Sequence, residues 1–290
     1  MDEDTKKLSE YGKRGVLYLV GTPIGNLEDI TYRAVRILQE AEIIAAEDTR
    51  QTRKLLTHLG ISGRLVSYHE HNKRASGPEL IRLMKEGTTI ALVSDAGLPA
   101  ISDPGTDLAQ MAMEEGIPVI PIPGPNAALS ALIASGMPTD AFTFLGFMPR
   151  DRKRLEEHLK RWKHVSSTFL LYESPHRIIK TLEGIEEHWG NRQICLAREL
   201  TKRHEEFVRG SVRECLAHLE EYPPIGEYCL IMEGTGEADA EEEIWWKKLS
   251  LEEHVAHYLA LHGNKKEAIK QTAADRKLPK REVYNHLLDS

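Results

Sequence analysis

Short apolar runs alternate with segments of helical periodicity through the first half of the chain. Each run holds four or five mostly apolar residues, which is typical of a buried strand, whereas apolar residues three and four positions apart indicate amphipathic helices. We expect strands at 16–20, 43–46, 89–93 and 119–122. We expect helices at 31–38, at 106–115 and in a basic segment that ends at 59. The alternation predicts an α/β subdomain with a largely parallel sheet over residues 15–125.

A second set of strands and helices predicts another α/β subdomain over residues 126–234. The apolar positions near 198–210 have the spacing of a hairpin, so we expect this sheet to be mixed rather than wholly parallel. The expected strands are 168–172, 193–198 and 227–232, and the expected helices are 151–162, 175–188 and 211–220.

Both ends of the chain have a different pattern. Residues 1–14 are polar and acidic at their start, which predicts a flexible tail and fits neither a signal peptide nor a transit peptide. An acidic linker without hydrophobic periodicity is expected at 235–246. The remaining residues, 247–290, predict a small helical domain with two or three helices, at 251–261, 265–276 and 280–288, similar to a helix-turn-helix.

The composition is that of a globular protein, with 41% hydrophobic and 29% charged residues among 290. No apolar run approaches the roughly 18–20 residues that cross a bilayer, so we expect no membrane association. The three cysteines, Cys195, Cys215 and Cys229, are far apart and form no Cys-x-x-Cys pair. This favours reduced core cysteines and a cytoplasmic location over disulfides or a zinc site.

The net charge of −7 argues at first sight against a nucleic-acid partner. However, residues 1–10 contribute −2 and residues 234–243 contribute −5, which leaves the rest of the chain neutral. Basic residues cluster at 150–163 and at 263–281. Because phosphate contacts depend on local basic patches more than on total charge, an RNA partner remains compatible with the sequence.

Three loops rich in Gly, Pro and Asp directly follow expected strands. They are Gly21-Thr-Pro-Ile-Gly-Asn-Leu27, Ser94-Asp-Ala-Gly-Leu-Pro99 with its continuation to Gly105, and Ile122-Pro-Gly-Pro-Asn-Ala127. Ligands bind at the carboxyl ends of strands in open α/β sheets, and glycine lets the backbone approach them closely. None of the three matches a P-loop or a Gly-x-Gly-x-x-Gly fingerprint. We therefore expect a ligand with an adenosyl group and modest charge.

These loops, together with Ala46-Glu-Asp-Thr-Arg50 and Tyr172-Glu-Ser-Pro-His-Arg177, resemble the tetrapyrrole-methylase family, and in particular its RNA-modifying branch. The similarity runs from about residue 16 to 234. It implies a tetrapyrrole-methylase fold of two α/β subdomains, with the cleft for the donor S-adenosylmethionine between them. It further implies 2′-O-methylation of a cytidine ribose in the decoding region of 16S rRNA, with 16S rRNA or the small ribosomal subunit as partner, and a homodimer.

The resemblance also assigns residues to the donor. The second loop has Ser94-Asp95-Ala96-Gly97 where relatives that modify tetrapyrroles have Gly-Asp-Pro, which favours the RNA branch. The positions that match the family's donor contacts are Pro23, Asp95, Leu98, Asn126, Ala127, Tyr172 and Leu200.

Methyl transfer to a ribose hydroxyl calls for a base or a hydrogen-bonding group, because the pKa of the hydroxyl is far above neutral. The candidates are Glu47, Asp48 and Glu199, with Glu173 as a further one. A helix cap or a salt bridge is the alternative role of each carboxylate. His69 and His71 flank one acid in an expected loop and do not form a ligand set, so no metal is expected.

RNA phosphates require cations near the cleft. The candidates are Arg50, Arg53, Lys54, Arg150, Arg152, Lys153, Arg154, Arg177, Arg198, Lys202 and Arg203. A splayed base is expected to stack on Phe147 or Tyr68. Two alternatives stay open: a methyltransferase that acts on a tetrapyrrole or another small molecule, and a non-catalytic RNA-binding protein.

Overall fold

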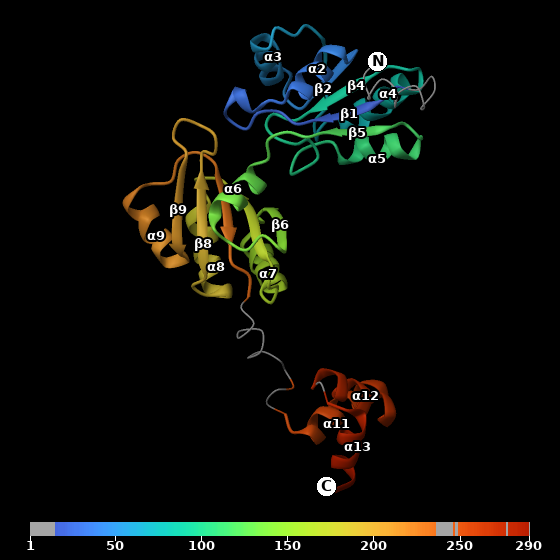
Figure 1. The fold of residues 1–290 in the computed structure, drawn as a ribbon, viewed down its shortest axis with the longest axis vertical. Coiled ribbons are helices and arrows are strands. Elements are labelled where there is room, and N and C mark those ends of the chain that lie inside the picture. The colour runs from blue at the N-terminus through green and yellow to red at the C-terminus, as the bar shows by residue number, and fades with distance from the viewer. Residues whose placement is uncertain (1–14, 236–245, 247–248, 277, 290) are drawn as a thin grey trace. The chain divides into compact units, whose positions relative to one another are not determined.

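The computed structural model describes residues 15–235, 246, 249–276 and 278–289 (Figure 1). The chain divides into two compact units, one that ends at Gly234 and one that begins at Thr235. The expected tail at 1–14 and nearly all of the expected linker at 235–246 lie outside the described residues.

The first sheet of the larger unit, predicted to be largely parallel, is parallel throughout. Its strand order is β3-β2-β4-β1-β5. The strands are β1 (Leu17–Val20), β2 (Ile43–Ala46), β3 (Arg64–Ser67), β4 (Ile90–Val93) and β5 (Val119–Ile122). Because β4, β1 and β5 are neighbours, the three Gly/Pro loops that follow them leave the same edge of the sheet side by side.

Helices cover both faces of this sheet (Figure 1). One face packs α2 (Tyr32–Glu40) and α3 (Thr49–His58) against residues such as Tyr18 and Ile44. The other face packs α4 (Lys73–Lys85) and α5 (Thr106–Glu114) against residues such as Leu17 and Ile43. Since successive side chains of a strand point to opposite faces, the uniformly apolar strands are those of a sheet buried on both sides.

The second sheet is mixed, which confirms the prediction from the hairpin-like spacing. Its order is β6-β7-β10-β8-β9, and only β6 and β7 run parallel. The strands are β6 (Phe142–Phe147), β7 (Thr168–Glu173), β8 (Gln193–Arg198), β9 (Glu206–Ser211) and β10 (Tyr228–Met232).

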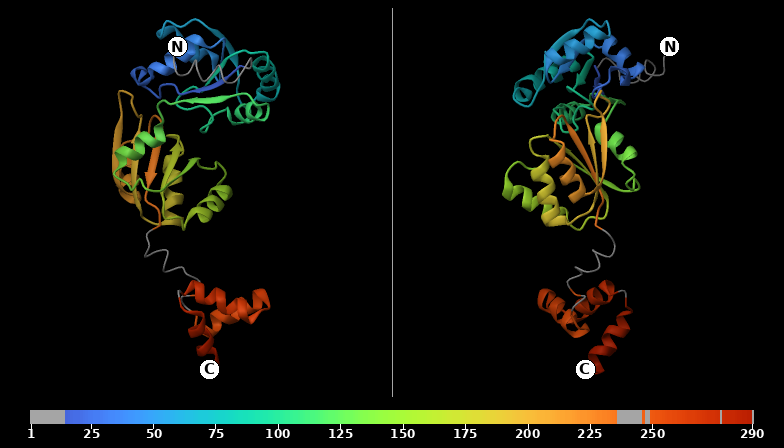
Figure 2. Two further views of the ribbon diagram at one scale, coloured as in Figure 1. Left: turned by 45° about the vertical axis from the view of Figure 1, so that its right-hand side comes forward. Right: turned by 90° about the vertical axis from the view of Figure 1, so that its left-hand side faces the viewer.

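The helices of the second sheet are divided unequally between its faces (Figure 2). A large apolar core lies beneath α7 (Arg152–Trp162), α8 (Ile178–Trp189) and α9 (Val212–Glu221). The opposite face is covered by α6 (Ala127–Ser135) alone among the described helices, through Ala128, Ala131 and Leu132. This face is therefore only partly covered, and Tyr172 and Leu200 lie along it.

Five elements have no counterpart among those expected from the sequence: the short 3-10 helix η1 (Leu27–Asp29), β3, α4, α6 and β6. The α4 helix contains Gly77-Pro78, which interrupts a helical signal. The α6 segment is apolar almost throughout and lacks amphipathic periodicity. The β6 strand has a register shift between Phe144 and Gly146, which breaks its alternation.

The described residues of the smaller unit form three helices, where two or three were expected. They are α11 (Leu251–His262), α12 (Lys265–Asp275) and α13 (Lys280–Asp289), and their core includes Val255, Ile269 and Val283. Buried His254 lies 3.1 Å from a carboxylate oxygen of Asp275. Among the described residues, no helix is both long and apolar enough to cross a membrane.

The first and third loops approach each other backbone to backbone. A Cβ atom on Gly21 would lie 2.8 Å from the Cα of Gly124, and one on Gly124 would lie 2.9 Å from the Cα of Gly21. Both distances are too short for carbon atoms that are not bonded. The two loops can pack at this distance only because both residues are glycine.

We expect Gly21→Ala to lower the free energy of unfolding by about 1–3 kcal/mol, because the loops must move apart to accept the methyl group. Gly184→Ala is the matched control, since the new Cβ in α8 would make an ordinary contact of 3.4 Å with Leu159. The control should gain about 0.5–1 kcal/mol from helix propensity. Urea denaturation of both variants checks the prediction, and equal stabilities would contradict it.

Candidate functional site

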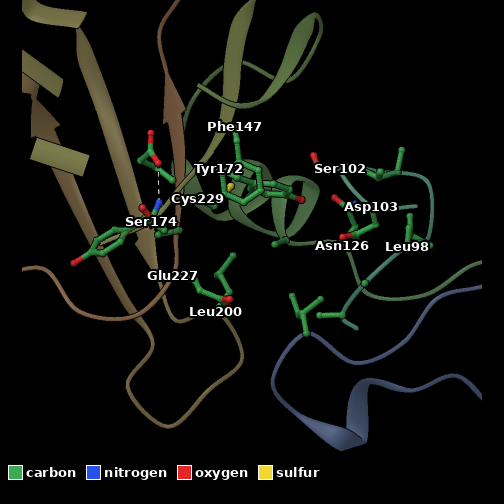
Figure 3. A pocket seen from close by; sticks show the side chains of 18 of the residues that line it. Leu98, Ser102, Asp103, Asn126, Phe147, Tyr172, Ser174, Leu200, Glu227 and Cys229 are labelled. Atoms are coloured by element: carbon green, nitrogen blue, oxygen red, sulfur yellow. Dashed lines mark hydrogen bonds between the residues drawn. The ribbon is translucent and has the colours of Figure 1, made fainter. Parts of the chain in front are cut away.

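A cavity of about 470 Å³ lies between the loops that follow strands of the first sheet and residues of the second sheet and its loops. Leu98, Ser102 and Asp103 lie on one side of it, and Phe147, Tyr172 and Leu200 lie on the other (Figure 3). Its volume is within the range of about 300–1,000 Å³ that small-molecule sites occupy. Its lining is mainly apolar with a few polar groups, which is the usual composition of such a site.

Hydrogen bonds join the first two loops at the wall of this cavity. Thr22 and Gly97 exchange two backbone hydrogen bonds, Thr22 N to Gly97 O at 2.9 Å and Gly97 N to Thr22 O at 3.0 Å. The Thr22 hydroxyl also donates to the carbonyl of Ser94 at 3.3 Å. Gly97 has a φ of +77°, which is a conformation that favours glycine. The loops thus form one rigid wall.

The continuation of the second loop is strained. Ala100 has a φ of +69° and Ser102 a φ of +62°, although neither is glycine. A hydrogen bond from Ala100 N to Pro104 O at 3.3 Å closes the turn around Asp103. Left-handed conformations of this kind persist where the surroundings enforce them and are concentrated at functional sites.

Tyr172 dominates the opposite wall. Its hydroxyl accepts a hydrogen bond of 3.2 Å from the backbone N–H of Ala128, in the first turn of α6. The rings of Phe144 and Phe147 pack against it with centroids at 5.1 and 5.6 Å. Burial raises the pKa of Tyr172 to about 12, so the side chain is a neutral phenol at physiological pH.

Asn126 joins the third loop to α6. Its side chain caps the helix by accepting a hydrogen bond of 2.9 Å from the N–H of Leu129. The backbone at the start of α6 is thereby fixed at the cavity, where Asn126 and Ala127 are part of the lining.

Three carboxylates gather at the edge of the first sheet. Glu47 follows β2, whereas Asp95 and Asp103 belong to the loop after β4. Burial and the neighbouring charge of Asp95 raise the pKa of Glu47. Burial, Glu47 and Asp95 together raise the pKa of Asp103 to about 7. Of the three carboxylates, Asp103 is the one that lines the cavity.

Two of the catalytic candidates are engaged in structural interactions. Asp48 is the N-cap of α3 and binds the guanidinium of Arg50 at 2.8 and 3.1 Å. These hydrogen bonds lower the pKa of Asp48 to about 2. Glu199 accepts hydrogen bonds from Lys202 Nζ at 2.8 Å and from the N–H of Glu227 at 2.9 Å. Burial opposes their effect on the pKa of Glu199, but the net shift is downward. Both groups are weaker bases than an ordinary carboxylate.

The predicted donor contacts fall into two groups. Leu98, Asn126, Ala127, Tyr172 and Leu200 line the large cavity. Pro23 and Asp95 instead line a smaller cavity of about 350 Å³, together with residues of α3. The sequence predicted that all of these residues lie in one region, but it did not indicate that they line two different cavities.

The predicted RNA-binding cations also divide by environment. Arg177 donates to the carbonyls of Met148 and Pro149 at 2.6 and 3.1 Å, and Lys202 binds Glu199 and Glu227. Arg198 is partly buried and pairs with Glu206 at 3.4 Å. The exposed members are Arg50, Arg53, Lys54, Arg150, Arg152, Lys153, Arg154 and Arg203.

Sequence reasoning did not select several residues that line the cavity, among them Ser102, Asp103 and Ser174. For Asp103 a signal was present, because Ser102-Asp103-Pro104-Gly105 repeats the Ser-Asp and glycine chemistry of Ser94–Gly97 within one loop. Two such turns after one strand indicate that both approach the same ligand.

The chain is similar in sequence to known proteins. The sequence profile described as "Tetrapyrrole (Corrin/Porphyrin) Methylases" matches residues 16–216. A protein of Halalkalibacterium halodurans named "Ribosomal RNA small subunit methyltransferase I" is 57% identical over 94% of both chains. A Bacillus subtilis protein of the same name is 49% identical over 97% of both chains.

Among solved structures, the crystal structure of uroporphyrin-III-C-methyltransferase from Thermus thermophilus is similar with a TM-score of 0.53. It is 26% identical in sequence and covers 75% of this chain and 94% of its own. The similarity confirms the predicted fold of two α/β halves.

The raised pKa of Asp103 has a consequence for stability. Folding favours the protonated form, since the pKa is 3.8 ordinarily and about 7 in the folded chain. The wild type therefore loses stability as the pH rises from about 4 to about 7, and Asp103→Asn removes this loss. Asp103 remains partly open to solvent, so we expect a gain of about 1–2 kcal/mol at pH 8, well below the full shift.

Denaturation of both proteins at pH 4.5 and pH 8 checks this prediction, with little difference expected at the lower pH. Asp107→Asn is the control, because Asp107 is exposed and pairs with Lys73 at 2.6 Å. A similar gain in the control, or none in Asp103→Asn, would count against the argument.

Proposed function

The chain belongs to the tetrapyrrole (corrin/porphyrin) methylase family, and from that premise we propose that it transfers a methyl group from S-adenosylmethionine to a ribose 2′-hydroxyl of small-subunit ribosomal RNA. The target is a cytidine in the decoding region of 16S rRNA, and the enzyme works in the cytoplasm, where ribosomal subunits are its partners. The observation that carries the proposal is the similarity over nearly the whole chain to relatives named as ribosomal RNA methyltransferases.

The large cavity fits the donor in size and in chemistry. Its apolar walls and the helix start at Asn126 and Ala127 suit an adenosyl group. The donor's sulfonium is cationic, and the cavity supplies the ring of Tyr172, whose face favours a cation. When bound, the donor supplies an activated methyl group on a neutral leaving thioether.

The chain's own residues then have to orient the two substrates and exclude water from them. The wall formed by the Thr22–Gly97 hydrogen bonds does not need to rearrange on binding, so the cavity is preorganised. The apolar lining excludes water, which strengthens electrostatic interactions inside the cavity. Tyr172 is fixed by Ala128 and by two aromatic rings, and gives the cavity one rigid face.

RNA binding is assigned to the exposed cations of α3 and of the segment that begins α7. Arg53 and Lys54 lie on the outer face of α3 and Arg152 is almost fully exposed at the start of α7. Phe147 is 56% exposed at the rim of the cavity and packs on Tyr172. A base splayed out of the RNA can stack on this ring. Tyr68, the other predicted stacking residue, is buried and unavailable.

We also propose that two copies of the chain associate through α6. Its outer face exposes Leu129 and Ile133, the latter by 80%. Exposed apolar side chains grouped on one helix are typical of an interface. Sedimentation equilibrium of the purified chain measures the stoichiometry, and a monomer at all concentrations would refute the dimer.

The proposed reaction is tested by mass-spectrometric mapping of ribose methylation in 16S rRNA. A strain that lacks the gene for this chain should lose a 2′-O-methylcytidine from a decoding-region fragment, and the cloned gene should restore it. Small subunits from that strain should accept tritium from labelled S-adenosylmethionine when the purified protein is added. Label on a tetrapyrrole with unlabelled subunits would favour the small-molecule alternative.

Arg152→Gln combined with Arg154→Gln should weaken binding to small-subunit RNA and reduce the slope of log affinity against log salt by about 2, because each lost phosphate contact removes about one released counterion. Filter binding at several salt concentrations measures both quantities. Arg82→Gln with Lys85→Gln is the matched control, since these cations of α4 pair with acids on their own surface. An unchanged slope would exclude the start of α7 from the interface.

A further inference from the structure

Asp103 projects into the cavity from the loop that follows β4, on the wall opposite Tyr172 (Figure 3). We infer that its carboxylate is the general base that takes the proton of the ribose 2′-hydroxyl. The inference rests on the proposed function and assigns to it a residue that is not among the catalytic candidates from the sequence.

The first support is the rigidity of the loop. Ala100 and Ser102 hold left-handed conformations directly before Asp103, and Gly105 follows it with a φ of +146°. A Cβ atom on Gly105 would lie 3.0 Å from Leu92 and 3.2 Å from the backbone nitrogen of Ala100, so the turn is packed tightly on itself. Strain of this kind fixes the direction of one side chain and is concentrated at functional sites.

The second support is that this loop touches both halves of the unit. A Cβ atom on Gly146 in β6 would lie 3.2 Å from the hydroxyl oxygen of Ser102. Gly146 leads directly to Phe147, the exposed ring at the rim of the cavity. Asp103 therefore lies within a cavity whose opposite wall carries the ring assigned to the splayed base, which is where a ribose hydroxyl has to arrive.

The third support comes from the other carboxylates at the cavity. Both oxygens of buried Glu173 are engaged, one by the N–H of Ser174 at 2.9 Å and one by the Thr181 hydroxyl at 2.7 Å. Glu227, which lines the cavity, and Glu199, which lies beside it, share the ammonium of Lys202 at 2.8 Å. Within the described part of the chain, no cationic side chain pairs with Asp103, so its carboxylate is the one left to accept a proton.

The charged and polar groups around Asp103 favour its action as a general base. Glu47 faces it from the end of β2, and Asp95 from the end of β4, and both oppose its ionisation together with burial. The Ser94 hydroxyl acts in the opposite direction, and neutral Tyr172 faces it from β7. A base with a pKa of about 7 is half ionised at neutral pH and is much stronger than an ordinary aspartate.

The proton balance is simple. Asp103 takes the hydroxyl proton while the ribose oxygen bonds to the methyl carbon, the carbon–sulfur bond breaks, and its electron pair stays on sulfur. Asp103 then releases the proton to water.

The test compares wild type with Asp103→Asn and with Asp107→Asn, an isosteric control on the outside of α5. The substrate is small subunits from the deletion strain, and single-turnover rates are measured between pH 5.5 and 8.5. The wild-type and control rates should rise about tenfold per pH unit at low pH and level off above about pH 7. Asp103→Asn should be slower by roughly 10²–10⁴-fold and should lack this rise.

Two readouts are independent of turnover. Calorimetry should give a dissociation constant for S-adenosylmethionine that changes less than tenfold in Asp103→Asn. A carboxyl carbon signal in the NMR spectrum of ¹³C-aspartate-labelled protein without donor should titrate near pH 7 in wild type and be missing in the variant.

An Asp103→Asn rate within threefold of wild type, or an unchanged pH profile, overturns the inference alone. A donor affinity lowered more than tenfold, with a normal rate at saturating donor, reassigns Asp103 to donor binding and also overturns it. A wild-type protein that methylates no subunits refutes the proposed function and this inference with it.

Discussion

The contact between two glycines, one after β1 and one after β5, is the constraint on which the site depends. The parallel order of the first sheet puts β1 between β4 and β5, so three loops must leave one edge within the width of three strands. They fit because Gly21 and Gly124 meet without side chains. The second loop is then tied to the first through Thr22 and Gly97, so this wall of the cavity takes its shape largely from backbone atoms, whereas side chains such as Tyr172 form the opposite wall.

The properties of the site also depend on the charged side chains at the edge of the first sheet. Burial and neighbouring carboxylates at the sheet edge raise the pKa of Glu47 and that of Asp103, the latter to about 7, and Asp103 is the one that lines the cavity. As a consequence, the folded state loses stability as the pH rises and Asp103 becomes ionised.

The sequence predicted the parts of this arrangement that depend on neighbouring residues. Uniformly apolar segments such as 43–46 and 90–93 identified buried strands, and glycine-rich turns after them identified the ligand edge. Residue roles that depend on distant partners could not be read in the same way. For Asp48 and Glu199 the sequence left a catalytic role and a structural role open, and in the structure one caps a helix and the other binds a residue 28 positions away. The raised pKa of Asp103 comes from its burial and from the charges of Glu47, which follows another strand, and Asp95.

Arg177, which was predicted to bind RNA, instead stabilises the local structure of the protein. Its guanidinium holds the carbonyls of Met148 and Pro149, the residues just before the basic start of α7, and lies 3.4 Å from the buried carboxylate of Glu173. A substitution here releases the segment that aims Arg152 and its neighbours outward. Weaker RNA binding in such a variant would thus result from displacement of the basic segment rather than from loss of a contact between Arg177 and RNA. An RNA interface mapped from affinity losses alone would therefore include residues that do not contact RNA.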